Sequence, residues 1–299
     1  MPAIVTEPVT EPVTEPLVRG DPKTTATYYE ETWLDYRMLW LNPSNRAIHF
    51  GYWDETTRNH SESLLNMNRV LASNLHPKTG DRILDCGCGV GGTAMWMAEN
   101  YDVDVTGITV TPDQVMRGNR YAGERGLDKR VRIALQDYCQ MAFPDETFDL
   151  VYGLESINYA PSKRQYLSEA FRVLKPGGRI VVQDGFRVDR ALTPAEHRLQ
   201  ESWLEGWVVP NLSSLPEFAG YAEEVGFTGV TQRDCTPNVI KSCRRLYRVT
   251  MACYPIAAGL HKVGLRSDLQ HGNVRAARDQ YRAMRKGLWG YGIVAADKP

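Results

Sequence analysis

The sequence has no apolar run long enough to cross a membrane and no excess of basic residues. Its 35 lysine and arginine residues face 36 aspartate and glutamate residues, for a formal net charge of −1. A spanning helix needs about 20 consecutive apolar residues, and a dedicated nucleic-acid binder needs a basic surface for phosphate contacts. The chain starts acidic and proline-rich, unlike a secretion signal. We therefore expect a soluble, cytoplasmic protein without stable membrane insertion and without a nucleic-acid partner.

Cysteine is also sparse, with six residues in 299, too few for a disulfide scaffold. Cys86 and Cys88 are separated by one residue, and no histidine lies close to any cysteine in the sequence. A zinc site would need at least two further ligands at metal-binding spacing. We therefore expect no metal.

What is present suffices for one large core, because 42% of the residues are hydrophobic. The repeat "TEPVTEPVTEPL" carries regular prolines that block helix and strand alike, so residues 1–22 are expected to form a disordered tail. Residues 23–299 then form one domain. It opens with an aromatic-rich helix from Thr24 to Leu41, followed by a second helix in "SLLNMNRVLASNL".

Short apolar segments and helical segments alternate from "DRILDCG" to "GRIVVQD". This alternation predicts a Rossmann-like, doubly wound α/β fold, a mostly parallel sheet with helices on both faces. The alternation stops after Asp184, where a helical cap is expected at about 187–222, and a further helical segment at about 238–285. A ligand should lie under the cap, at the carboxyl ends of the strands.

The stretch "ILDCGCGVGG" at 83–92 ends a predicted strand and begins a predicted helix. Gly87, Gly89 and Gly91 therefore occupy a turn at which backbone can approach a nucleotide-like group closely. A tight corner without a ligand uses the same residues, so this stretch alone leaves both readings open.

Three motifs in order, "ILDCGCGVGG", "FDLVYGLES" and "EAFRVLKPGGRIVVQD", resemble those of the class I S-adenosylmethionine-dependent methyltransferases over residues 60–235. The segment "VTGITVTPDQV" is similar to the branch of sterol, tocopherol and terpenoid C-methyltransferases. The resemblance implies S-adenosylmethionine as cofactor. It also implies that Asp85 holds the methionine amino group, that Gly87 approaches the carboxypropyl chain, that Thr109 and Gln114 contact the ribose, and that Asp137 and Tyr138 meet the adenine. Further cofactor contacts are expected from Cys88, Gly89, Val110, Gln136 and Leu154.

The acceptor is indicated by "GLESINYAPS". In related natural-product O-methyltransferases a histidine base follows this strand, whereas this chain has Asn158 and Tyr159. A neutral alkene has no proton to lose before attack, and its methylation creates a carbocation. Aromatic faces can stabilise this cation, and a carboxylate can remove a proton from it. The resemblance therefore favours C-methylation of an isoprenoid-bearing substrate in secondary metabolism, with or without cyclisation. The expected catalytic residues are Glu155, Tyr159 and His49, and the expected substrate-binding residues are Tyr28, Tyr36, Trp203, Trp207 and Asp184.

Several alternatives stay open. An O- or N-methyltransferase and a non-catalytic cofactor-binding protein fit the same fold. Cyclopropane synthases share the cofactor branch, but their cysteine-rich active-site segment has no counterpart here. The aromatic residues could be ordinary core, and Glu155 could accept backbone N–H groups from the turn after it. Arg244 and Arg245 could bind a diphosphate or form a solvated face, and no aspartate-rich motif supports a diphosphate. The density of aromatic residues in the first helix favours a homo-oligomer.

Overall fold

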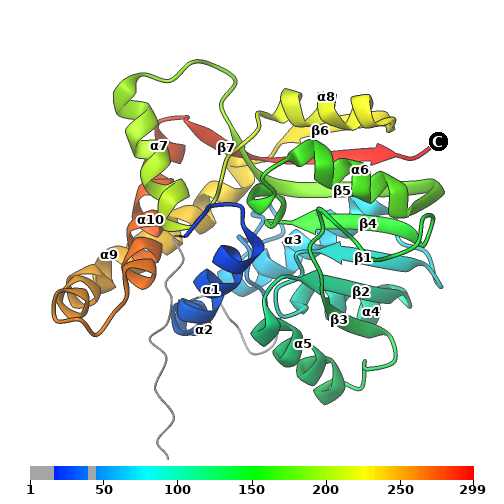
Figure 1. Cartoon of the computed structure of the whole chain (residues 1–299), viewed down its shortest axis with the longest axis horizontal. Coiled ribbons are helices and arrows are strands. Elements are labelled where there is room, and N and C mark those ends of the chain that lie inside the picture. Colours follow the sequence, from blue (N-terminus) through cyan, green and yellow to red (C-terminus); the bar gives the residue numbers. More distant parts are fainter. Residues whose placement is uncertain (1–16, 40–44) are drawn as a thin grey trace, which may run out of the picture.

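A seven-stranded sheet forms the centre of the protein (Figure 1). The computed structural model describes residues 17–39 and 45–299, so most of the expected tail and the end of the first predicted helix lie outside the described residues. The strand order is β3-β2-β1-β4-β5-β7-β6. The first five strands pair in parallel, and β7 pairs antiparallel with β5 and β6. The strands are β1 (Arg82–Cys86), β2 (Asp104–Thr109), β3 (Val131–Leu135), β4 (Phe148–Leu154), β5 (Leu174–Arg187), β6 (Thr228–Asp234) and β7 (Trp289–Asp297).

Helices cover both faces of this sheet, as the alternation predicted. Successive strand residues point to opposite faces, so Ile83 packs with α3 (His60–Leu75) and α4 (Gly92–Tyr101), and Leu84 packs with α6 (Lys163–Val173) and α8 (Leu215–Val225). The helix α5 (Pro112–Glu124) begins after Thr111 and has proline in its first turn. The predicted fold class is confirmed. In the described part of the chain, no helix is long and apolar enough to span a membrane.

The first aromatic segment forms two helices, α1 (Pro22–Glu31) and α2 (Trp33–Leu39), instead of the one helix predicted over 24–41. The break falls at Thr32, whose hydroxyl donates to the Tyr28 carbonyl oxygen at 2.6 Å. A threonine side chain that bonds back to a carbonyl four residues earlier competes with the helical ladder and bends the chain. The spacing of the aromatic residues gave no indication of this break in the helix.

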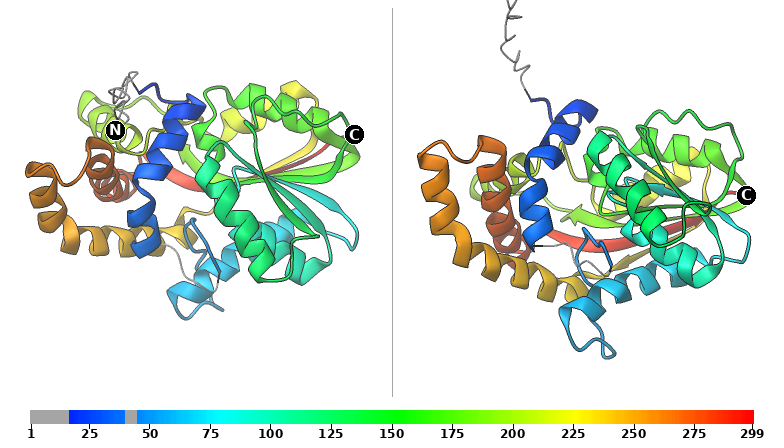
Figure 2. Two further views of the ribbon diagram at one scale, coloured as in Figure 1. Left: turned by 60° about the horizontal axis from the view of Figure 1, so that its bottom comes forward. Right: turned by 90° about the horizontal axis from the view of Figure 1, so that it is seen from below.

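The remaining helices form a separate layer beyond the sheet: α7 (Pro194–Gly206), α9 (Thr236–Lys262) and α10 (Asp268–Arg285). In Figures 1 and 2 this layer lies at one end of the molecule, with α1 and α2 between it and the sheet. The helices α7 and α10 meet closely, because a Cβ atom on Gly206 would lie 2.4 Å from the Gly272 carbonyl oxygen. The expected cap segment thus contains α7, which packs on α10, and most of α8, which packs on α6.

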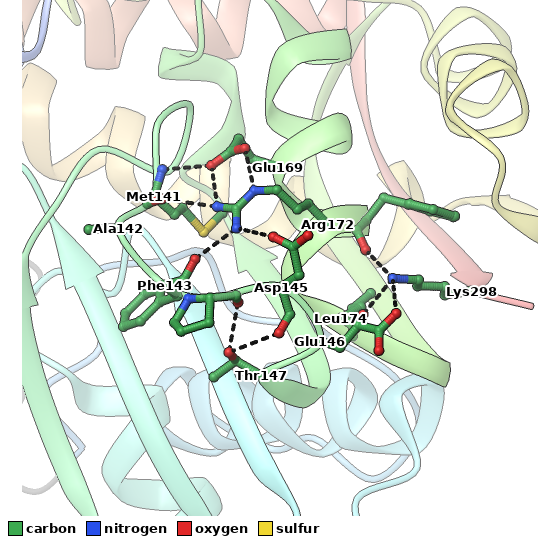
Figure 3. Close-up of polar contacts among 12 residues, drawn as sticks. Met141, Ala142, Phe143, Asp145, Glu146, Thr147, Glu169, Arg172, Leu174 and Lys298 are labelled. Carbon is green, nitrogen blue, oxygen red and sulfur yellow. Dashed lines mark hydrogen bonds and ion pairs between the residues drawn. The ribbon is translucent and has the colours of Figure 1, made fainter.

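The loop between β3 and β4 is held by one arginine (Figure 3). Arg172, at the end of α6, donates to the carbonyl oxygens of Met141 and Phe143 at 2.9 and 2.7 Å. It also forms ion pairs with Glu169 and Asp145. Glu169 in turn accepts the Met141 N–H at 2.7 Å. The network fixes the far end of the loop that begins at Gln136.

Candidate functional site

A cavity of about 940 Å³, partly open to solvent, lies at the carboxyl ends of β1, β2 and β4. It contains the glycine loop and most of the residues expected to contact the cofactor. Those that line it are Asp85, Gly87, Cys88, Gly89, Thr109, Val110, Gln114, Asp137, Tyr138 and Leu154. Gln136 does not line it, because its side-chain oxygen accepts the Ala142 N–H at 2.9 Å.

The glycines of this loop are needed for two different reasons. Gly87 has φ +80°, and a Cβ atom there would lie 2.4 Å from the Ser156 Cβ. Gly89 has φ +55°, and a Cβ atom there would meet only the end of the Ile48 side chain, at 3.4 Å. Gly87 therefore lets two loops approach each other, while Gly89 leaves space that belongs to the cavity. The second arrangement supports the cradle interpretation over a ligand-free corner.

The two cysteines of the loop fill space. Burial raises the pKa of both the Cys86 and the Cys88 thiol well above the ordinary range, so both stay protonated. A Cβ atom on Gly107 would lie 2.7 Å from the Cys88 sulfur, so the thiol packs directly on β2. Such thiols behave as small apolar groups.

Asp85 is a buried acceptor facing the cavity. Its side chain is 2% exposed and accepts the Tyr152 hydroxyl at 2.7 Å. Burial raises the pKa of Asp85 to about 7, against the effect of that hydrogen bond. A carboxylate that is costly to ionise in the free protein gains most from a positively charged ligand group. Its environment suits the methionine amino group.

Thr109 and Gln114 are joined before any ligand binds. The Thr109 hydroxyl donates to the Gln114 side-chain oxygen at 2.6 Å and accepts the Thr111 N–H at 3.2 Å. This arrangement orients the Gln114 carboxamide at the start of α5. Asp137 accepts the Cys139 N–H at 2.8 Å, and the Tyr138 hydroxyl donates to the Ser156 carbonyl at 2.8 Å. The polar groups of the cavity are therefore positioned by the chain itself.

A second cavity, of about 620 Å³, adjoins the first. Four residues line both: Tyr29, Ile48, Glu155 and Tyr159. Of the expected substrate-binding residues, Tyr36, Trp203, Trp207 and Asp184 line the second cavity. The two cavities thus meet at Glu155 and Tyr159, which allows a group in one to reach a group in the other.

Glu155 sits on strained backbone at this junction. It follows β4 directly and has φ +52°, a conformation that residues other than glycine rarely adopt. Its carboxylate oxygens accept the Phe50 N–H at 2.9 and 3.0 Å and the Tyr291 hydroxyl at 2.9 Å. Burial and the nearby Asp184 raise the pKa of Glu155 well above its usual range, against these donors. The backbone N–H that Glu155 accepts belongs to Phe50, in the segment before α3. The alternative interpretation, in which Glu155 accepts N–H groups from the turn after it, is therefore wrong.

Asp184 supports the turn that carries Tyr159. One of its oxygens accepts the N–H groups of Ile157 and Asn158, and the other accepts the Asn158 carboxamide at 2.6 Å and the Gly185 N–H at 2.7 Å. Burial raises the pKa of Asp184 to about 6, against these N–H donors. With both oxygens engaged by the protein, Asp184 holds the site together, although it also lines the second cavity.

The aromatic residues divide between wall and support. Tyr29 lines both cavities, and its hydroxyl donates to the Tyr159 hydroxyl at 3.2 Å. Tyr28 lines neither cavity. It is fully buried behind them, and its hydroxyl contacts Tyr36 at 3.1 Å and Asn273 at 2.9 Å. Sequence alone did not separate these neighbours, because the direction of each side chain depends on how α1 packs against α10.

His49 lines the first cavity but is held by the protein. Its Nδ1 lies 2.8 Å from the Phe50 carbonyl oxygen. Burial lowers the pKa of His49 to about 4, against hydrogen bonds to Phe50 and Asn68. The imidazole is therefore neutral at physiological pH, as a proton acceptor would have to be.

Three aromatic residues that line the second cavity were not predicted from the sequence. Trp289 and Tyr291 reach the second cavity from β7, and Phe50 reaches it from the segment before α3. Trp289 and Tyr291 are two residues apart, which places them on one face of a strand. That alternation in "LWGYGIV" was the available signal. No local pattern shows that β7 lies next to β5 in the sheet.

This fold and cofactor cavity define a class I S-adenosylmethionine-dependent methyltransferase. A sequence model described as mycolic acid cyclopropane synthetase matches residues 32–248, and the chain belongs to this family. S-adenosylmethionine is accordingly its cofactor. The match establishes the family and leaves the acceptor open.

Relatives differ in the atom they methylate. The chain is 35% identical over 189 residues to 27-O-demethylrifamycin SV methyltransferase of Amycolatopsis mediterranei (strain S699). This match covers 62% of this chain and 68% of that protein. The chain is 34% identical over 179 residues to 24-methylenesterol C-methyltransferase 2 of Oryza sativa subsp. japonica, covering 59% of this chain and 49%, about half, of that protein.

Solved structures share the fold. The [4+2]-cyclase SpnF superposes with a TM-score of 0.78 at 21% identity, covering 94% of this chain and 97% of that chain. Geranyl diphosphate C-methyltransferase from Streptomyces coelicolor A3(2) superposes with a TM-score of 0.72 at 21% identity, covering 93% and 97%. At these identities the likeness concerns the fold alone.

Proposed function

We propose that this enzyme methylates a carbon of an isoprenoid or terpenoid alkene through a carbocation on the substrate, in cytoplasmic natural-product biosynthesis. The observation that carries the proposal is the position of Glu155, at the junction of the cofactor cavity with an aromatic-lined second cavity. A relative named for methyl transfer to a sterol carbon supports the same type of acceptor.

Bound S-adenosylmethionine supplies a methyl group on a positively charged sulfur. In the proposed reaction the alkene π electrons form the new C–C bond, and the C–S electron pair remains on sulfur. The positive charge then lies on a substrate carbon between aromatic side chains such as Tyr29, Trp203 and Trp289. Cation–π attraction lowers the energy of such a charge, by about 2 kcal/mol where water is excluded.

Glu155 then removes a proton from the carbon next to the cation, and the C–H electron pair forms the new double bond. The nearby positive charge favours the ionised carboxylate that burial and Asp184 disfavour in the free protein. The Phe50 N–H and the Tyr291 hydroxyl hold the carboxylate in place for this transfer. Cyclisation of the cation before proton loss would give a second product class.

An O- or N-methyltransferase of a small natural product is the alternative, supported by the rifamycin relative. A hydroxyl acceptor would then need a base before or during methyl transfer, and the residues at the expected position are Asn158 and Tyr159. The Asn158 carboxamide is already engaged with Asp184 and the Gly185 carbonyl oxygen. That engagement favours the carbon acceptor.

The test is Glu155→Gln, assayed by transfer of radiolabelled methyl to terpenoid alkenes and to phenols. The substituted carboxamide retains an acceptor for the Phe50 N–H but loses the charge. Turnover of the alkene should fall by about 10²- to 10⁴-fold, the range for loss of a general base, with S-adenosylmethionine affinity little changed. Tyr291→Phe is the comparison variant: it removes one donor to Glu155 but keeps the carboxylate, so its alkene turnover should fall much less than that of Glu155→Gln. Unchanged alkene turnover in Glu155→Gln, or faster methylation of phenols by the unaltered enzyme, would refute the proposal.

A further inference from the structure

The hairpin of α9 and α10 carries a charge opposite to that of the remaining chain. Eleven of the 35 lysine and arginine residues, but only two of the 36 aspartate and glutamate residues, lie in residues 236–286. This segment therefore carries a formal +9, and the rest of the chain carries −10. The overall charge of −1 conceals this separation. A hairpin with this excess of positive charge attracts an anionic partner.

Helix α9 itself has no acidic residue over its 27 residues. Its exposed basic side chains include Arg244, Arg245, Arg248 and Lys262, and among the described residues none of these four has an ion-pair partner. The Arg244–Arg245 pair lines neither cavity, so it does not hold a diphosphate at the site.

The second half of α9 and the turn after it are apolar and exposed. No charged residue occurs from Thr250 to Leu260. Eleven large hydrophobic side chains are exposed in the described part of the chain, and five of them lie in residues 251–265. We call these five the apolar tip: Met251, Ile256, Leu260, Val263 and Leu265. Ile256, Val263 and Leu265 are 68%, 67% and 72% exposed.

Two of these basic residues and one residue of the apolar tip share one helical face. Arg244, Arg248 and Met251 are spaced four and three residues apart, which places them in one row. Figures 1 and 2 show the turn between α9 and α10 at the end of the molecule opposite the C-terminus. Arg266 and Ser267 of this turn contact Asp35 and Glu31 of α2 and α1, while Val263 and Leu265 stay exposed. A face that joins unpaired cations to exposed apolar side chains fits the boundary between lipid headgroups and acyl chains.

We propose that α9 docks the enzyme on the surface of an anionic lipid bilayer, with the apolar tip entering the headgroup layer and the basic residues contacting lipid phosphates. Neither signal suffices alone, since stable attachment takes an apolar insertion together with a basic patch. Each basic residue near an anionic surface strengthens binding by about fivefold. This docking is independent of the atom that the enzyme methylates.

The experiment is sedimentation of the full chain with vesicles of equal parts phosphatidylglycerol and phosphatidylcholine, and with phosphatidylcholine alone. The enzyme should sediment with the anionic vesicles, less so at high salt, and weakly with the neutral ones. Ile256→Ser/Val263→Ser/Leu265→Ser should reduce partitioning at least tenfold. The matched control is Met116→Ser/Leu135→Ser, which removes side chains that are 65% and 55% exposed elsewhere and should change nothing.

The charge is tested with Arg244→Glu/Arg245→Glu against Arg69→Glu/Lys129→Glu, which alters the net charge equally at other exposed positions. Only the first pair should lose the preference for anionic vesicles. Retained S-adenosylhomocysteine binding and thermal melting would show that each variant is folded. Absence of sedimentation, or equal losses in test and control variants, would overturn the proposal. Light scattering that finds an oligomer broken by the apolar-tip variant would also overturn it, since a second copy would then cover the tip.

Discussion

The ionisation of Asp85 should control cofactor affinity. Burial raises the pKa of Asp85 to about 7, so below that pH most free enzyme carries a neutral carboxyl at the position expected for the methionine amino group. Binding of the ammonium group favours the ionised carboxylate, and affinity should therefore rise with pH and level off above about pH 7. The ionised fraction falls tenfold per pH unit, so S-adenosylhomocysteine should bind roughly tenfold more weakly at about pH 6 and roughly 100-fold more weakly at about pH 5.

Isothermal titration calorimetry between about pH 5 and about pH 8 measures this dependence, and Asp85→Asn is the control. The variant should bind weakly and lose the pH dependence. The sign for stability is opposite: a carboxyl whose pKa is raised by folding stabilises the free protein below the ordinary aspartate pKa, and this contribution is lost as pH rises through about 7. The thermal shift produced by S-adenosylhomocysteine should therefore grow with pH. Affinity that is constant with pH, or a slope that persists in Asp85→Asn, would refute the reasoning.

Two further predictions concern the cofactor cavity. Gly89→Val should abolish most S-adenosylmethionine binding, measured by calorimetry. The control is Gly80→Val: Gly80 also has a positive φ but has no neighbour within 4 Å of its Cβ position, so this variant should lose only stability. Equal affinity in both variants would show that Gly89 does not face the cofactor. Arg172→Met should lower the free energy of unfolding by about 2 kcal/mol in denaturant titrations, because charge-assisted bonds to the β3–β4 loop are lost, and should weaken binding. Arg164→Met, on the same helix as Arg172, removes an exposed ion pair with Glu224 of α8 and should do neither.

The cofactor cavity was predictable because its determinants are local. The turn from β1 to α4 needs glycine at defined positions. Asp85, Thr109 and Asp137 could be located because each lies at or just after the end of a predicted strand. Gln136 shows the limit of this reasoning: its neighbour Asp137 lines the first cavity, whereas Gln136 does not.

The second cavity was less predictable because distant elements form it. Trp203 and Tyr36 were recognised as aromatic residues on helices, but nothing local separates them from Tyr28, which packs behind the wall. Trp289 and Tyr291 depend on the insertion of β7 between β5 and β6. Asp184 was expected to bind substrate, and no pattern in the sequence indicated that it accepts the N–H groups of the turn at Ile157 and Asn158.

The position of β7 has a consequence for how the second cavity forms. The first cavity takes its glycine loop, Thr109, Gln114 and Tyr138 from residues 85–138, whereas the second cavity joins Tyr29 to Trp289 and Tyr291, more than 250 residues further along the chain. Contacts so far apart in sequence form only after the intervening chain has been ordered. The second cavity therefore depends on contacts between the most distant parts of the described chain, whereas the glycine loop depends on contacts between neighbouring elements. The second cavity is complete only when β7 has joined the sheet, because Trp289 and Tyr291 are two of its aromatic walls.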